Sequence, residues 1–144
     1  DAIIMSDSED ISDSKIFCEI NVSSIDTGIK ARDNHLRSAD FFDVEKYPTM
    51  NFASKDIIRT EMENVYEMTG SLRIKNVSRP VTLEMIYNGK DIDNYGQEKL
   101  GFDINGKIKR SDWDLDFNIH GGKNTLLIGD EVDIDISIQI IRVD

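Results

Sequence analysis

Apolar residues recur at every second position through most of the chain, and this period of two predicts β-strands with one buried and one solvent-facing side. The pattern is clearest over 131–140, where Val132 and four isoleucines alternate with acidic and polar residues. A short apolar strand end at 2–5 opens the chain. The same alternation recurs in five further segments: 16–22, 50–52, 66–75, 81–87 and 100–109. The chain is therefore predicted to be an all-β protein of antiparallel strands.

Turn-forming residues separate these segments. Short connections are predicted at Asn88-Gly89, Asn94-Tyr95-Gly96, His120-Gly121-Gly122 and Gly129-Asp130, and new strands are predicted to begin at Pro48 and Pro80. A strand of about a dozen residues spans roughly 40 Å, about twice the common length. Such strands must curl against another layer or close on themselves. A barrel of about eight strands either fills with its own side chains or holds one small ligand, and periodicity leaves both open.

The segment 27–54 departs from the alternation because it combines charged residues, an imidazole and two adjacent phenylalanines. It predicts a short helical insertion near residues 33–42. Asp33 is expected to cap a helix through 34–37, and Ser38 or Asp40 to cap another turn. Acid, base and imidazole together also suit general acid–base catalysis. No nucleophile motif accompanies them, and one loop rarely supplies a convergent site, so the sequence favours a capped helix.

Length and charge narrow the classes of function. The 144 residues suit one domain, and no apolar run is long enough to span a bilayer. With 17 basic and 28 acidic residues, the net charge of −11 disfavours nucleic acid as a partner, and also docking to anionic lipid by charge alone. The single cysteine, Cys18, shares the parity of Ile16 and Ile20, so it is predicted to be a small core residue. One cysteine leaves the compartment undecided.

Metal-binding patterns are weak. His35 and His120 lie far apart in the sequence, so a zinc site would need ligands from distant places. The stretch from Asp91 to Gly96 begins like a calcium-binding loop. It has Tyr95 at the fifth position and Phe102 at the twelfth, where oxygen ligands are needed. The sequence therefore predicts a turn there, no metal site and no cofactor.

Several motifs together resemble one known family. The run from Ser23 to Ser54, S-x-x-D-T-G-x-x-x-R-D-x-H-L-R-S-x-D-F-F-D-V-E-K-Y-P-x-x-x-F-x-S, closely resembles the hallmark of the YceI-like family of lipocalin-like polyisoprenoid-binding proteins. The resemblance continues at Thr69-Gly70-Ser71-Leu72, Val77-Ser78-Arg79-Pro80-Val81, Gly101-Phe102, Arg110-Ser111-Asp112-Trp113 and Gly129-Asp130-Glu131-Val132. It covers nearly the whole chain. At Asn76 and Asp114 the family commonly has glycine instead.

The resemblance implies an extended antiparallel lipocalin-like β-barrel of about eight strands, whose long pore holds an isoprenoid chain such as a quinone or polyprenyl phosphate. It also implies a homodimer and a bacterial source, with many members periplasmic; periplasm and cytoplasm stay undecided here. Residues 1–144 would form a single YceI-like barrel domain that lacks the family's N-terminal strand region. We expect the natural chain to begin earlier, or a partner to cover the gap.

The function implied is non-enzymatic binding, storage or transport of an isoprenoid lipid or quinone, since each buried methylene contributes about 0.8 kcal/mol. The expected lining is Phe41, Phe42, Met50, Phe52, Met68, Leu72, Leu83, Met85, Phe102, Ile104, Trp113, Ile136 and Ile138. Arg32, Asp33, His35 and Arg37 would form a lid or meet a head group. Two alternatives stay open: an enzyme acting on such a lipid through His35 and Asp33, and a structural barrel with a filled core.

Overall fold

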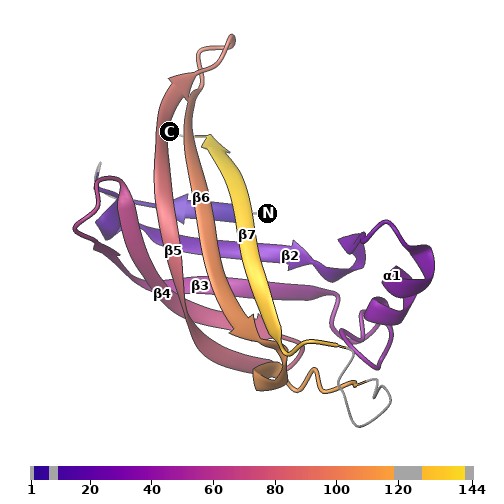
Figure 1. The fold of residues 1–144 in the computed structure, drawn as a ribbon. Coiled ribbons are helices and arrows are strands. Elements are labelled where there is room, and N and C mark those ends of the chain that lie inside the picture. The colour runs from indigo at the N-terminus through magenta and orange to yellow at the C-terminus, as the bar shows by residue number, and fades with distance from the viewer. Residues whose placement is uncertain (1, 7–9, 119–127, 142–144) are drawn as a thin grey trace.

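A computed structural model describes residues 2–6, 10–118 and 128–141. They form one seven-stranded antiparallel sheet in which the strands follow one another in chain order from β1 to β7. The sheet curls on itself into a half-barrel, with β5, β6 and β7 crossing in front of the strands β2, β3 and β4 (Figure 1). The prediction of an all-β, antiparallel, lipocalin-like architecture is confirmed.

The strands are long, as the alternation predicts. Their bounds are β1 (Ala2–Met5), β2 (Lys15–Asn21), β3 (Thr49–Arg59), β4 (Val65–Ile74), β5 (Val77–Ile92), β6 (Glu98–Lys109) and β7 (Glu131–Ile141). The helical elements are α1 (Lys30–Arg37) and three short 3-10 turns, η1 (Ile11–Asp13), η2 (Val22–Ser24) and η3 (Arg110–Trp113). Within the described ranges, no helix is long and apolar enough to cross a membrane.

One face of the sheet carries the core, because successive side chains of a strand point to opposite faces. Along β4, for example, Met68, Leu72 and Ile74 are buried, whereas Glu67 and Arg73, at the alternate positions, are exposed. Gly70 interrupts this apolar row for a steric reason. A Cβ atom at this position would lie 2.5 Å from the Phe52 ring and 2.5 Å from the Ala53 carbonyl oxygen, so only glycine lets the ring pack against β4.

Two predicted connections need correction. Asn88-Gly89 does not join two strands but lies inside β5, where the register to β6 shifts between Tyr87 and Gly89. A glycine with φ of +107° permits this bulge, so the β5 strand continues through it. Pro80 is likewise inside β5, opposite Ser71 of β4, rather than at the start of the strand.

Other connections follow the sequence more closely. The turn at 94–96 joins β5 to β6 as predicted, and Pro48 directly precedes β3. The predicted turn at His120-Gly121-Gly122 lies outside the described residues. Asp114 adopts the left-handed conformation, with φ of 56°, at the end of η3. That conformation is the one glycine favours, and aspartate adopts it here at the end of η3.

The helical insertion lies where the sequence places it, but Asp33 does not cap it. The helix begins at Lys30, three residues before Asp33. Its N-cap residue is Ile29, which makes no side-chain capping bond. Asp33 lies within the helix and is buried. The prediction that Asp33 is the N-cap is therefore wrong. Ser38 does cap the next turn, since its hydroxyl oxygen accepts the N–H of Asp40 at 3.3 Å.

Candidate functional site

The concave face of the half-barrel is the candidate site, and its apolar lining divides into a closed and an open part. In the closed part, the side chains of β4, β5, β6 and η3 pack tightly against one another. Met68, Met85, Phe102 and Trp113 are the largest side chains there, and each is almost fully buried. This part of the interior is filled by the protein's own atoms, so no guest fits between these residues.

The open part follows β7. Its inward-facing residues Ile134, Ile136, Ile138 and Ile140 are only partly buried, although they pair in register with the β6 segment that contributes Phe102 and Ile104 to the core. Cys18 and Ile20 of β2, on the same face, are also partly buried. Burial raises the pKa of the Cys18 thiol, which therefore stays protonated and acts as a small apolar residue. We name these six residues the open strip.

The residues predicted to line a pore fall into both parts. Nine are buried: Phe41, Phe52, Met68, Leu72, Leu83, Met85, Phe102, Ile104 and Trp113. Four are partly buried: Phe42, Met50, Ile136 and Ile138. Their role as ligand contacts stays a prediction. Burial nevertheless distinguishes the two groups, because only the partly buried side chains present apolar surface that a guest can cover without displacing the core.

Helix α1 lies at the end of the half-barrel where β7 begins (Figure 1). Two of its arginines hold the preceding loop through backbone carbonyl groups. Arg32 donates to the Thr27 carbonyl at 2.9 Å, and Arg37 donates to the Ser23 carbonyl at 2.9 Å and also to that of Ile25. Asp33 accepts the Thr27 N–H at 2.9 Å and the Thr27 hydroxyl. These three charged residues fasten the helix to the loop that precedes it.

His35 belongs to a different group of residues on α1. Its Nε2 atom lies 2.8 Å from a carboxylate oxygen of Asp40. Its ring meets those of Phe41 and Phe117 edge to face, with centroid distances of 5.1 Å and 4.7 Å. His35 and Asp33 therefore do not share a hydrogen bond, and the acid–base pair suggested by the sequence is not formed. The three rings instead pack against one another beside α1.

Sequence reasoning missed the residue that holds Phe117 in place. Arg110 is a buried cation whose guanidinium donates to the carbonyl oxygens of Leu115, Phe117 (2.9 Å) and Gly129 (2.8 Å). These acceptors offset the cost of removing the charge from water. The available signal was the arginine in the R-S-D-W motif, but its role required contacts with residues up to 19 positions away.

We expect the Asp33–Thr27 contact to make the free energy of unfolding depend on pH. The hydrogen bond from the Thr27 hydroxyl lowers the pKa of Asp33, although burial acts in the opposite direction. A lowered folded-state pKa means that the carboxylate stabilises the fold above the ordinary carboxyl pKa of about 3.9, and that this contribution is lost as pH falls through the lowered value. In urea unfolding, Asp33→Asn should therefore be less stable than the unmodified protein at pH 6, with the difference shrinking below about pH 3. A difference that stayed constant from pH 6 to pH 2 would contradict this role.

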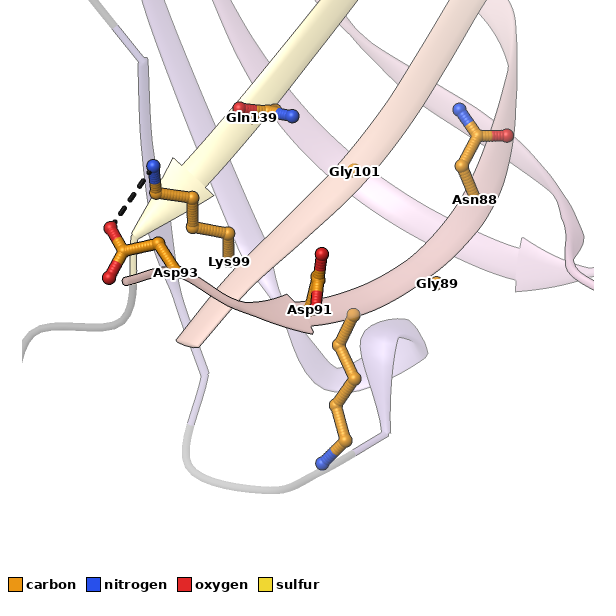
Figure 2. A pocket seen from close by; sticks show the side chains of 8 residues that line it. Asn88, Gly89, Asp91, Asp93, Lys99, Gly101 and Gln139 are labelled. Atoms are coloured by element: carbon orange, nitrogen blue, oxygen red, sulfur yellow. Dashed lines mark ion pairs between the residues drawn. The ribbon is translucent and has the colours of Figure 1, made fainter. Parts of the chain in front are cut away.

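Two hollows on the structure are polar and lie apart from the open strip. One, of about 390 Å³, lies along the β5–β6 hairpin between Asn88, Asp91, Lys99 and Gln139 (Figure 2). It exists because Gly89 and Gly101 face each other across the two strands without side chains. The other, of about 290 Å³, lies over β4–β6 and includes Glu67, Glu84 and Asn105 among its residues. Neither has the apolar lining that an alkyl chain requires.

A metal site finds no support in the part of the chain that the structure describes. There, no group of three or more His, Cys, Asp or Glu side chains lies close enough to hold an ion. His120, which the sequence analysis considered as a zinc ligand and disfavoured, lies outside the described residues. Asp93, in the calcium-like stretch, instead pairs with Lys99 at 3.2 Å. The described geometry thus suits apolar binding better than metal chemistry.

Comparison with known proteins gives one consistent result. The model of the YceI-like domain matches residues 1–140. Protein YceI of Escherichia coli O157:H7 is 35% identical over 128 residues, which cover 89% of this chain and 63% of that protein. A UPF0312 protein of Photorhabdus laumondii is 35% identical over 136 residues, covering 94% of this chain and 67% of that protein. The chain thus spans about 63 to 67% of the length of these curated relatives.

Solved structures agree with the sequence comparison. The crystal structure of the Campylobacter jejuni YceI protein superposes with a TM-score of 0.83 and 32% identity, covering 100% of this chain and 81% of that one. BcnA of Burkholderia cenocepacia superposes with a TM-score of 0.81 and 26% identity, covering 97% and 82%. The family match over nearly the whole chain and the likeness of the folds lead to the same assignment. The chain belongs to the YceI-like family.

Proposed function

We propose that the protein binds a long isoprenoid lipid along the open strip and stores or carries it without chemical change. The observation that supports this most directly is the partial exposure of four isoleucines on the inward face of β7. On the adjacent strand β6, Phe102 and Ile104 of the same face are buried, whereas these four side chains keep part of their apolar surface accessible. Apolar surface left on a concave face is typical of a binding site.

The size and chemistry of the strip suit an extended alkyl chain. From Ile134 to Ile140 the strand rises about 20 Å at about 3.4 Å per residue. Each methylene that the strip covers contributes about 0.8 kcal/mol, so a multi-unit chain can be held by contacts without a preferred direction. Met50, on the same face, adds a flexible side chain that adapts to a ridged ligand.

The charges near α1 favour a neutral head group such as a quinone over a pyrophosphate. Arg32 and Arg37, two cations of α1, already donate to backbone carbonyl oxygens of the 23–27 loop. Binding a pyrophosphate with them would require breaking those bonds. The net charge of −11 also repels anions over longer distances. A neutral head group avoids both costs.

The test is whether the protein purifies with a lipid and rebinds one after its removal. Native mass spectrometry and organic extraction of the natural protein should release an isoprenoid. After extraction, a short-chain ubiquinone should quench the fluorescence of Trp113, the single tryptophan, whose buried side chain belongs to the closed part. A preparation free of lipid that also fails to bind either quinone or polyprenol would refute the proposal.

A further inference from the structure

The inward face of β5, β6 and β7 carries no charge along the open strip, but a cation follows the last isoleucine. Residues directly opposite one another in antiparallel strands point to the same face. The rows of this face are Ile134 with Gly106, Ile136 with Ile104 and Met85, and Ile138 with Phe102 and Tyr87. In the next row the register places Ile140 opposite Leu100 and Leu100 opposite Lys90. Lys90 therefore ends an otherwise uncharged face.

The bulge in β5 is what brings Lys90 to the inward side. Tyr87 points inward, so strict alternation would place Gly89 on this side and Lys90 on the other. The register shift between Tyr87 and Gly89 adds one residue, so that Gly89 lies opposite Gly101 and Lys90 opposite Leu100. Bulges commonly redirect a side chain in this way, and they are frequent next to functional sites.

Tyr87 provides a second donor, in the row before Lys90. Its partly buried ring packs against the Phe102 ring at a centroid distance of 5.4 Å. The Tyr87 hydroxyl has no hydrogen-bond partner within residues 2–6, 10–118 and 128–141. No fully buried side-chain N or O atom in those ranges lacks a partner, so this hydroxyl is accessible. An accessible hydroxyl beside apolar side chains can orient a bound guest.

The charge of Lys90 is offset by a neighbour. Its Nζ atom lies 3.4 Å from a carboxylate oxygen of Glu98, and the Lys90 side chain is 64% exposed. This long contact uses one of the three N–H donors of the ammonium group, and no other described residue accepts from it. Lys90 and Glu98 together carry no net charge. The pair therefore suits an uncharged acceptor better than a phosphate, which needs unpaired cations.

We propose that the polar head of the lipid binds between Tyr87 and Lys90, with its tail running from Ile140 toward Ile134. This inference rests on the proposed function, because it concerns the same open strip. Two donors at the end of an apolar face favour a head group that accepts hydrogen bonds without carrying charge, as the carbonyl oxygens of a quinone do. The head thus lies at the end of β7 away from α1, and not at the helix (Figure 1).

The test compares a ligand with a head group and one without. Short-chain ubiquinone is titrated by Trp113 quenching, and squalene, an isoprenoid hydrocarbon, is measured by its displacement of that quinone. Tyr87→Phe and Lys90→Met each remove a donor and keep the apolar part of the side chain. Each should weaken ubiquinone binding about fivefold, as is typical for one lost hydrogen bond. Squalene affinity should stay within about twofold of the unmodified protein.

Matched controls make the same substitutions elsewhere. Tyr95→Phe removes a hydroxyl from a side chain that is 90% exposed in the β5–β6 turn. Lys107→Met removes an ammonium group that is likewise 64% exposed and paired with a glutamate, but on the opposite face of β6. Both should bind ubiquinone as the unmodified protein does. Circular dichroism and urea unfolding check that every variant is folded.

The outcomes separate this inference from the proposed function. Ubiquinone binding weakened in the Tyr87 and Lys90 variants alone, with squalene unaffected, supports the head-group position. Unchanged ubiquinone binding in both variants overturns that position and leaves the carrier function standing. Equal loss for squalene also overturns it, because the substitutions would then act on the tail. Tighter binding of a polyprenyl phosphate than of ubiquinone contradicts the neutral head group. An unmodified protein that binds neither quinone nor polyprenol refutes both proposals.

Discussion

An Ile138→Asp variant is expected to lose binding of an isoprenoid or quinone by about a hundredfold. Ile138 lies in the middle of the open strip, directly opposite Phe102 in the register of β6 and β7. Covering an unpartnered polar group with a lipid costs about 2–7 kcal/mol, and 1.4 kcal/mol corresponds to a factor of ten. Titration with a short-chain ubiquinone, followed by Trp113 fluorescence, measures the loss.

Gln139→Asp provides the matched control. Gln139 is the next residue of the same strand, is exposed and faces the convex side. It receives the same new charge, so general electrostatic repulsion or a weakened β7 strand would affect both variants equally. We expect Gln139→Asp to bind the quinone within about twofold of the unmodified protein. Similar losses in both variants would place the ligand somewhere other than the concave face.

Trp113→Ala is expected to lower the free energy of unfolding by about 3–5 kcal/mol, as is typical for truncating a large buried aromatic side chain. Trp113 is 2% exposed, and its indole N–H donates to the Leu72 carbonyl oxygen at 3.0 Å. The substitution leaves a cavity between η3 and β4 and removes the donor from a buried carbonyl. Urea unfolding followed by circular dichroism measures the change, because the variant lacks tryptophan fluorescence.

Two further variants identify the source of that loss. Trp113→Phe keeps most of the volume but not the N–H, so it should recover more than half of the lost stability. Met62→Ala truncates an exposed apolar residue and should change stability by less than about 0.5 kcal/mol. If Trp113→Ala unfolded at the same urea concentration as Met62→Ala, the closed part would not be the stabilising core that its burial indicates.

The strands and their inward faces could be predicted from the sequence because burial on one side imposes a local rule. Every second residue of β4 and β7 must be apolar if one face is covered, and that pattern can be read without knowing what covers it. At Asn88-Gly89, by contrast, the local pattern led to a wrong prediction, because it indicated a turn where the structure has a bulge inside β5. An Asn-Gly pair has the same composition in a turn and in a bulge, and only the partner strand decides between them.

The site was predicted less completely, because its contacts join residues that are far apart in the chain. Helix α1 was expected, but the side chain of Asp33 turns back to Thr27 instead of capping the helix. Phe117 meets the ring of His35 from a separate segment, and no local pattern marks either partner. The degree of burial along β7 also depends on how far the sheet curls. The sequence shows which face is apolar, but not how much of it is covered.

The division of the concave face into a closed part and an open part has an evolutionary consequence. The residues that hold the fold together, such as Met85 and Phe102, are not those with surface left for a guest, such as Ile136 and Ile140. Under the proposed function, changes along β7 would therefore alter the length or shape of the lipid tail that the protein binds, at little cost to folding. One scaffold would in this way accept different lipids while its core stays the same.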